Sequence, residues 1–213
     1  MLKIDRFIFN LISENTYIVA DGASKECIII DPGCSDATEK NELSAFIMKN
    51  GLRLKAFFNT HCHVDHILGN RFLKETYNAE FLAPEEDVFL LDLMVKEAVN
   101  FGLKMDASPL PDRLIKEDLH FELGGREVKF LFTPGHSPGG YCLYFKDDKI
   151  CFTGDTLFRE GIGRTDLWGG DYEAIINSIE TRLFSLPDDV VIYPGHGEKS
   201  TIGHEKTSNP FLA

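Results

Sequence analysis

Residues 60–66, with the sequence Thr-His-Cys-His-Val-Asp-His, constrain this chain more than any other stretch. Three imidazoles and one carboxylate fall within six residues, directly after a strand-like apolar run. Side chains of an extended segment alternate between two faces, so His61, His63 and Asp65 are expected to project together. His66 follows where the chain must turn and can reach a second point nearby. Imidazole and carboxylate are ligands of zinc and iron, so the stretch indicates a metal site rather than a solvated loop.

Three later segments share one pattern: an apolar run, then small or turn-forming residues, then one candidate ligand. The ligands are His136 after Thr133-Pro134-Gly135, Asp155 after Phe152-Thr153-Gly154, and His196 after Tyr193-Pro194-Gly195. A lone histidine after a strand is usually an ordinary surface residue, but the repetition favours a shared site. Of the seven histidines, His120 and His204 lie outside the pattern and are expected to be surface or packing residues.

Composition narrows the class of protein. The 213 residues suit one domain, expected to span residues 1–213. No apolar stretch approaches the ~20 residues that cross a bilayer, and the N-terminus has no signal-peptide pattern, so no membrane association is expected. Five widely spaced cysteines favour a reducing compartment and hence a cytoplasmic protein. The formal net charge of −12 argues against nucleic acid, which needs clustered Lys and Arg.

Local patterns predict a mixed α/β (α+β) chain. Strands are expected at 2–9, 16–20, 27–30, 54–58, 80–83 and 190–193, with several more between 121 and 153, and helices at 37–50, 68–77, 84–101 and 172–184. The helix 84–101 begins at Pro84, and Glu85, Glu86 and Asp87 suit its positive N-terminal end. Its apolar face suits packing against the core, with a lid or a dimer contact as the alternative.

The four motifs together resemble those of one known family. THCHVDH resembles the HxHxDH signature of the metallo-β-lactamase superfamily, and its later motifs are similar to TPGHSPGG, FTGDTLF and YPGHG, in the same order. The resemblance covers nearly the whole chain and implies the family's four-layer αββα sandwich. Within the superfamily, the loop Gly161–Asp166 and the ending Thr207–Phe211 look most like the small glyoxalase II-like hydrolases.

The resemblance also implies a dinuclear metal centre. Seven candidate ligands are more than one tetrahedral ion uses, so two divalent ions are expected. Zinc is the first expectation, and iron or manganese suits the same ligands. A hydroxide bridging the two ions would be the nucleophile. By resemblance, one ion is held by His61, His63 and His136, the other by Asp65, His66 and His196, and Asp155 bridges them.

Three side chains carry further expectations. Asp65 and Asp31 are the candidate catalytic residues; Asp31 would accept an imidazole N–H and fix its tautomer, or would simply be a turn aspartate. Arg164 lies in the loop after the Asp155 strand and would bind a substrate carboxylate. Alternatively, Arg164 pairs with Asp166 or Asp171.

The expected function is metal-dependent hydrolysis of a small anionic thiolester, with lactoylglutathione as the first substrate to test. Full-length glyoxalase II enzymes bind glutathione through a C-terminal helical region, whereas only Lys199 and Lys206 are basic in the residues after His196. The alternatives are a mononuclear iron persulfide dioxygenase and a lactone or β-lactam hydrolase of the same fold. A nuclease or a non-enzymatic binding module fits the chain less well, and the sequence does not predict an oligomeric state.

Overall fold

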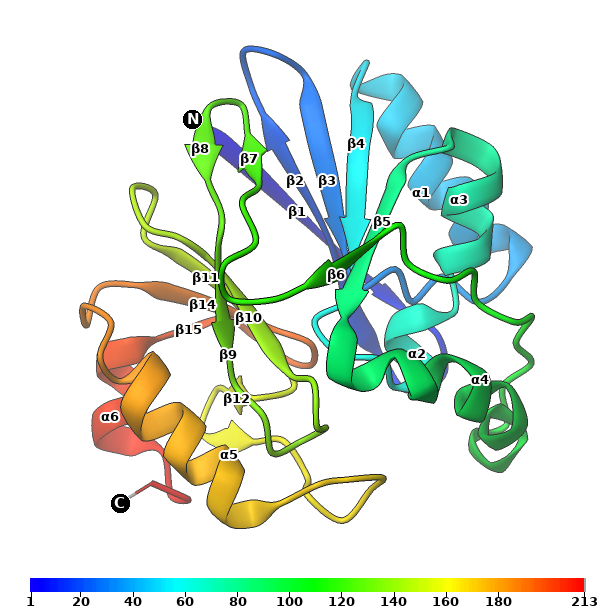
Figure 1. The fold of residues 1–213 in the computed structure, drawn as a ribbon. Helices are drawn as coiled ribbons and strands as arrows, with labels where there is room; N and C mark the ends of the chain where they lie inside the picture. Colours follow the sequence, from blue (N-terminus) through cyan, green and yellow to red (C-terminus); the bar gives the residue numbers. More distant parts are fainter. Residues whose placement is uncertain (213) are drawn as a thin grey trace.

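Two β-sheets pack face to face in the computed structural model, which describes residues 1–212 (Figure 1). The first sheet has the order β1-β2-β3-β4-β5-β6: Leu2–Phe9, Glu14–Asp21, Glu26–Ile30, Arg53–Phe58, Glu80–Pro84 and Arg113–Ile115. The second has the order β15-β14-β11-β10-β9: Ser200–Thr201, Val191–Pro194, Ile150–Gly154, Tyr141–Phe145 and Lys129–Phe132. Two short pairs complete the strands: β7 (Glu122–Leu123) with β8 (Arg126–Glu127), and β12 (Leu157–Phe158) with β13 (Gly161–Ile162).

Helices cover the outer face of each sheet (Figure 1). Those of the first half are α1 (Ala37–Lys49), α2 (Val64–Ile67), α3 (Asn70–Tyr77) and α4 (Val88–Glu97), the last with a 3₁₀ turn at each end (Glu85–Asp87 and Ala98–Phe101). Those of the second half are α5 (Tyr172–Ser178), which continues as a π-helical turn (Ile179–Leu183), and α6 (Ile202–Ser208). The molecule is therefore an αββα sandwich, as expected.

Strand periodicity explains the layers, because alternate side chains of a strand face opposite sides of its sheet. On β2, Tyr17 and Val19 are buried between the two sheets, where they meet Phe152 and other residues of the second sheet. Ile18, between them in sequence, points the other way and packs under the first-half helices with Leu43. A third apolar cluster joins the second sheet to α5 and α6. Each sheet is thus buried on both faces.

The helix expected at 84–101 is present but consists of a central α-helix between two 3₁₀ turns. Leu90, Leu91, Met94 and Ala98 are buried, which confirms the core-packing interpretation. Asp87 does not serve the helix N-terminus as expected, because its side chain makes no capping hydrogen bond and is fully buried. Six elements were not predicted at all: the strands β6, β12, β13 and β15, the short helix α2 and the C-terminal helix α6.

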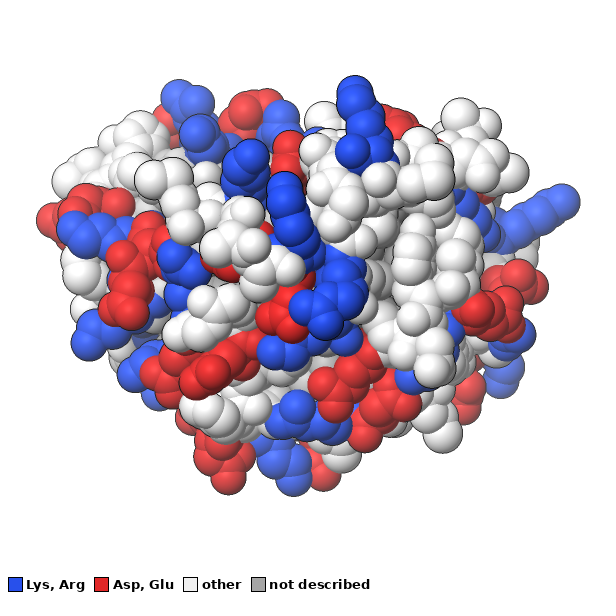
Figure 2. Space-filling view, turned by 90° about the horizontal axis from the view of Figure 1, so that it is seen from above, with Lys and Arg blue, Asp and Glu red and all other residues white. Residues whose placement is uncertain are grey.

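Charged side chains of both signs are interspersed on the face drawn in Figure 2, and no wide area of one sign dominates it. The excess of acidic over basic residues gives the formal net charge of −12. Within residues 1–212, none of the helices has the length and apolar character that a membrane span needs.

Candidate metal centre

The candidate ligands converge because each follows the carboxyl end of a strand. In the first sheet β3 and β4 run parallel, so Asp31 and the segment beginning at Thr60 leave the same edge. In the second sheet β11 and β14 run parallel, and Asp155 and His196 follow them. These edges of the two sheets face each other, and polar side chains from both halves of the chain meet there.

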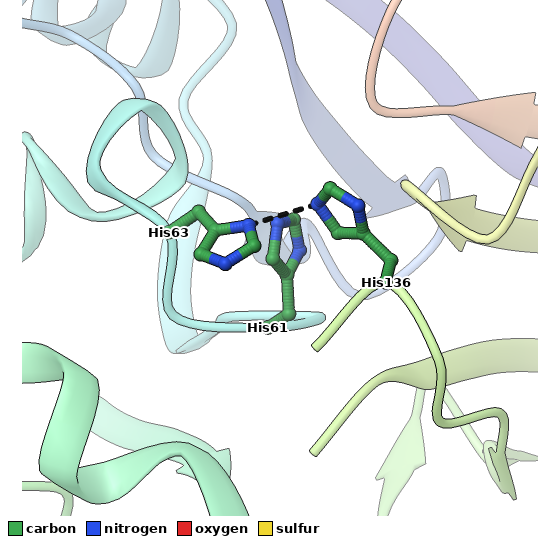
Figure 3. Close-up of side chains that lie close together, drawn as sticks. All are labelled: His61, His63 and His136. Atoms are coloured by element: carbon green, nitrogen blue, oxygen red, sulfur yellow. Dashed lines mark hydrogen bonds between the residues drawn. The ribbon is translucent and has the colours of Figure 1, made fainter. Parts of the chain in front are cut away.

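His61, His63 and His136 form the first cluster (Figure 3). Each offers a ring nitrogen, and the three atoms lie within 4.8 Å of one another. The closest approach joins His63 Nδ1 to His136 Nε2, at 2.8 Å. All three side chains are buried. Three imidazole nitrogens aimed at one buried point are the donor set of a zinc or iron site.

Asp65, His66 and His196 form the second cluster, again with ligand atoms within 4.8 Å of one another. Asp65 Oδ2 lies 3.1 Å from His196 Nε2 and 3.5 Å from His66 Nε2. Strand alternation wrongly grouped Asp65 with the first cluster, because the extended conformation ends at His63 and α2 begins at Val64. The helical turn rotates Asp65 toward the second cluster.

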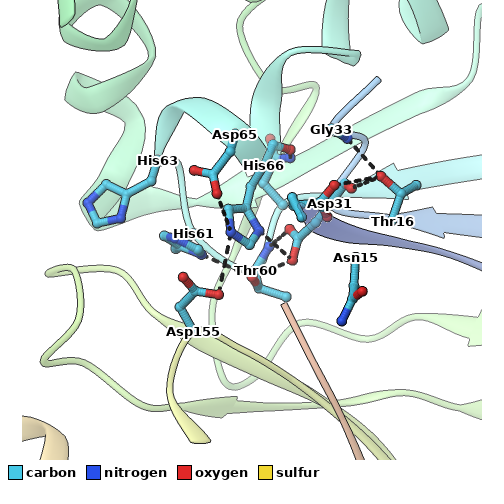
Figure 4. A network of polar contacts seen from close by, with 12 residues as sticks. Asn15, Thr16, Asp31, Gly33, Thr60, His61, His63, Asp65, His66 and Asp155 are labelled. Atoms are coloured by element: carbon cyan, nitrogen blue, oxygen red, sulfur yellow. Dashed lines mark hydrogen bonds and ion pairs between the residues drawn. The ribbon is translucent and has the colours of Figure 1, made fainter. Parts of the chain in front are cut away.

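Asp155 lies between the two clusters and faces both. Its Oδ1 is 3.4 Å from His66 Nε2 (Figure 4). Its Oδ2 is 3.4 Å from His136 Nε2 and 3.6 Å from His196 Nε2. One carboxylate thus contacts both clusters: Oδ2 lies near a histidine of each, and Oδ1 lies near His66 of the second.

Three of these histidines have the outward ring nitrogen close to an oxygen atom of a neighbouring residue. His136 Nδ1 donates to the carbonyl oxygen of Arg164 at 2.7 Å, and His196 Nδ1 donates to that of Ser13 at 3.3 Å. His66 Nδ1 lies 3.1 Å from Asp31 Oδ2, which places Asp31 beside the imidazole as expected, at ion-pair distance and without hydrogen-bond geometry (Figure 4). Such partners fix the tautomer and leave the inward nitrogen with a free lone pair, as metal-binding histidines require.

The inward atoms themselves lack partners. His61 Nε2, His66 Nε2 and Asp155 Oδ1 are buried and have no hydrogen-bond partner within residues 1–212. Buried polar atoms are nearly always paired, so unpaired ones call for an explanation. Metal ions at this position would satisfy these atoms, and the residues present therefore fit the metal that the ligand pattern predicts.

Electrostatics at the site favour cations. Burial lowers the pKa of His61, and burial together with His136 lowers that of His63 to about 3, so both rings stay neutral. Burial opposes protonation of His66, but nearby carboxylates, Asp65 first, outweigh it and raise its pKa well above its ordinary value. Burial alone would raise the pKa of Asp155, whereas the adjacent His66 holds it well below its ordinary value. The second cluster thus attracts positive charge.

Residues 10–196 match the sequence model of a protein family that is described as the metallo-beta-lactamase superfamily. The chain belongs to this superfamily. Its members among curated proteins include the hydroxyacylglutathione hydrolase GloC of Haemophilus influenzae, 42% identical over 190 residues and 88% of each chain. They also include the probable metallo-hydrolase YqgX of Bacillus subtilis, 35% identical over 99% of this chain and 98% of that protein.

Two solved structures have nearly the same fold as this chain. The BLEG-1 B3 metallo-beta-lactamase superposes with a TM-score of 0.90 over 99% of both chains, at 29% identity. TTHA1623, determined in a di-iron-bound form, superposes with a TM-score of 0.87 over 98% of this chain and 100% of that one, at 35% identity. The architecture is therefore the metallo-β-lactamase fold, and the superfamily relatives support a metal-dependent hydrolase.

A pocket of about 480 Å³ opens directly onto the candidate metal ligands of this metallo-β-lactamase fold. Its floor includes His63, Asp65, His136, Asp155 and His196. The remaining lining is almost entirely apolar, with Arg164 as the exception: Ile12, Val64, Phe101, Phe158, Ile162, Leu167 and Trp168. The Trp168 ring lies 6.0 Å from that of His63 and 6.4 Å from that of Phe101, edge-on in both cases.

Arg164 borders the pocket as its loop position predicts, but its guanidinium is already paired. Nε and Nη2 donate to the two carboxylate oxygens of Asp166, at 2.6 and 2.7 Å. This ion pair lowers the pKa of Asp166 to about 2, through the hydrogen bond from Arg164. Of the two roles considered for Arg164, the geometry matches the pairing with Asp166.

Four residues near the site escaped the sequence analysis. Glu14 is fully buried beside Asp31, and burial raises its pKa well above its ordinary value. Asn15 and Asp87 are buried and hydrogen-bonded to loops that carry ligands. Trp168 was passed over because its loop has no periodicity. A local signal existed only for Glu14 and Asn15, two polar residues at the start of a strand whose centre, Tyr17 to Ala20, is apolar.

Proposed function

We propose that this protein hydrolyses a small thiolester at a centre of two divalent metal ions. One observation carries the proposal: Asp155 faces both ligand clusters within a pocket large enough for a small substrate. Two ions held there would supply a hydroxide nucleophile at neutral pH and would polarise the thiolester carbonyl. No serine or cysteine nucleophile is then needed.

The chain's own residues prepare this chemistry in three ways. His61, His63 and His136 present neutral imidazoles, and Asp65, His66 and His196 present a mixed set, so the two positions differ in charge. The apolar wall of the pocket excludes water from the reacting carbonyl. Asp31 orients the His66 ring, and through Thr60, whose hydroxyl donates to Asp31 Oδ2 at 2.7 Å, it also steadies the segment that begins the ligand loop.

Zinc is the metal we propose first. Imidazole nitrogen and carboxylate oxygen suit zinc, iron and manganese alike. A similar solved structure is described in a di-iron-bound form, so iron is the principal alternative. Metal quantification on well-loaded protein decides between them.

The similarity to a hydroxyacylglutathione hydrolase supports a thiolester substrate, and lactoylglutathione remains the first one to assay. The pocket adds a preference. Because Arg164 is paired with Asp166, a substrate carboxylate would have to displace an intramolecular partner. Most of the wall is apolar, so we propose that thiolesters with an uncharged, apolar acyl group are the better substrates.

The test combines metal analysis with a substrate panel on the same sample. About two ions per chain and release of thiol from thiolesters are expected. A reproducible single iron with oxygen uptake on a persulfide would replace this proposal with the dioxygenase alternative. Turnover of lactones or β-lactams, with no thiolester hydrolysis, would replace the substrate class and keep the metal centre.

A further inference from the structure

The metal centre lies at the junction of the two halves of the chain. His61, His63, Asp65 and His66 lie on one short segment of the first half. The ligands of the second half, His136, Asp155 and His196, each come from a different loop. The second-half loops must therefore be held in register with the first half by contacts other than the ligands.

We propose that Asp87 and Asn15 are positioning residues, each of which fixes one second-half ligand loop onto the first half and so serves one of the two metal sites. Asp87 would serve the site of His61, His63 and His136, and Asn15 the site that includes His196. The inference rests on the two ligand sets of the proposed function. Neither residue is itself within the ligand clusters.

Asp87 joins the two loops of the first cluster through one buried carboxylate. Its Oδ2 accepts from the backbone N–H of Cys62 at 3.1 Å and from the hydroxyl of Ser137 at 2.8 Å, and its Oδ1 accepts from the N–H of Gly139 at 2.6 Å. Cys62 lies between two histidine ligands, and Ser137 directly follows His136. A buried carboxylate with three donors is a strong hydrogen-bonding centre.

The Asp87 side chain is tightly packed against Gly139. A Cβ at Gly139 would lie 2.7 Å from Asp87 Oδ1, so only glycine allows this approach. The Asp87 side chain is fully buried. The distance between the His63 and His136 loops is therefore set by a rigid contact.

Asn15 holds the His196 loop in an analogous way from β2. Its Nδ2 donates to the carbonyl oxygens of Pro194 and Gly197, at 3.0 and 2.9 Å, and its backbone N–H donates to that of Gly195 at 2.7 Å. These three carbonyl groups bracket His196 on both sides. The Tyr17 hydroxyl, from the same strand, also donates to Pro194 at 2.7 Å.

The two contacts are separate in space and in their targets. Asp87 touches no residue of the His196 loop, and Asn15 touches none of the His136 loop, among the hydrogen bonds of residues 1–212. Because metal affinity depends on ligand placement, loss of one contact should weaken one site and spare the other.

The chain provides matched controls within its second half. Glu205 is a buried carboxylate that accepts from Glu160 N–H, Ser200 Oγ and Asn209 Nδ2, all in that half. Asn209 is a buried asparagine whose Nδ2 donates to Gly161 and Glu205. Glu205→Gln and Asn209→Ala therefore remove comparable hydrogen bonds without touching the junction.

The test measures the affinity of each site for cobalt(II), by competition with a chelator and by the absorption spectrum, which reports the donor set. Asp87→Asn should weaken the three-histidine site roughly 10–100-fold, and Asn15→Ala should do the same to the other site, each leaving its counterpart within about 3-fold. The two controls should lower the melting temperature of the metal-free protein and leave both affinities unchanged. Ser137→Ala, which removes one hydrogen bond of the three, should reproduce a milder Asp87 effect and replaces Asp87→Asn if that variant does not fold.

The positioning role is overturned if the controls weaken metal binding as much as Asp87→Asn and Asn15→Ala, or if those two variants weaken both sites equally. A failure of the proposed function looks different. If the unmodified protein binds two ions but cleaves no thiolester, the substrate class is wrong and the affinity comparison still stands. If it binds one ion, only the variant assigned to that site should weaken it, and any other pattern refutes the assignment.

Discussion

Replacing Trp168 by alanine tests whether the apolar wall selects the substrate. The Trp168 ring stands edge-on to His63 at 6.0 Å between ring centroids, so it borders the position proposed for the substrate carbonyl. An aromatic acyl group should use this wall, whereas an acetyl group is too small to reach it. Trp168→Ala should therefore penalise a phenylacetyl thiolester more than an acetyl thiolester of the same thiol.

The size of the effect follows from the contact area. If a substrate ring buries against the wall about a quarter of the 150–250 Å² typical of an aromatic side chain, it covers about 40–60 Å². At ~25 cal/mol per Å² this contact contributes about 1–1.5 kcal/mol. Edge-to-face ring packing adds about 0.5–1.5 kcal/mol. The total of about 1.5–3 kcal/mol corresponds to a loss of about 10- to 150-fold in kcat/KM.

The assay follows thiol release under steady-state conditions, with bound metal quantified in each sample. The acetyl thiolester should lose less than about 3-fold. Phe89→Ala is the matched control, because Phe89 is an exposed aromatic residue of α4 that does not line the pocket. Equal losses for both substrates, or a loss of metal, would refute the wall as a specificity element and make Trp168 a structural support.

Four further predictions concern the metal centre and the pocket. Chelation should lower the melting temperature at neutral pH, because buried carboxylates would face one another without cations; an unchanged curve after verified metal loss contradicts this. Asp155→Asn should empty both sites, whereas Asp31→Asn should weaken one by roughly 10–100-fold, and equal, mild effects would mean that Asp155 does not bridge. As pH falls, the site of Asp65, His66 and His196 should release its metal first, because His66 has a raised pKa and its protonation competes with metal binding. The site of His61, His63 and His136 should keep its metal to lower pH, because the pKa of His63 is about 3. Simultaneous release in a metal titration between pH 8 and 5 argues against this order. Arg164→Ala should change KM equally for charged and uncharged thiolesters, and a selective rise for the charged one would restore its role in anion binding.

The convergence of the candidate ligands was predictable because their positions depend on local sequence. Each ligand follows an apolar strand and a turn, and strands that run in one direction end at one edge of a sheet. Asp65 shows where such reasoning ends. The direction of its side chain is set by a helical turn that begins only one residue earlier, at Val64. A helix of four residues is too short to show a periodic pattern in the sequence.

The residues that surround the candidate ligands could not be predicted, because they contact the site from distant parts of the sequence. Asp87 acts on Ser137, fifty residues away, and carries no pattern that separates it from the acidic residues before it. Trp168 and Phe101 meet across the pocket from segments that have no regular pattern in common. Such contacts depend on how the two halves dock, and a strand or helix pattern contains no information on docking.

The five cysteines, all free and all buried, have a chemical consequence if the proposed reaction releases a thiol. Burial raises the pKa of the Cys62 thiol, which lies between two metal ligands, well above its ordinary value. Thiol–disulfide exchange requires a thiolate and access to solvent, and Cys62 offers neither. A thiol product, or the disulfide that it forms on oxidation, therefore finds no exposed cysteine thiol among residues 1–212 with which to form a mixed disulfide. Turnover should then not inactivate the protein by S-thiolation.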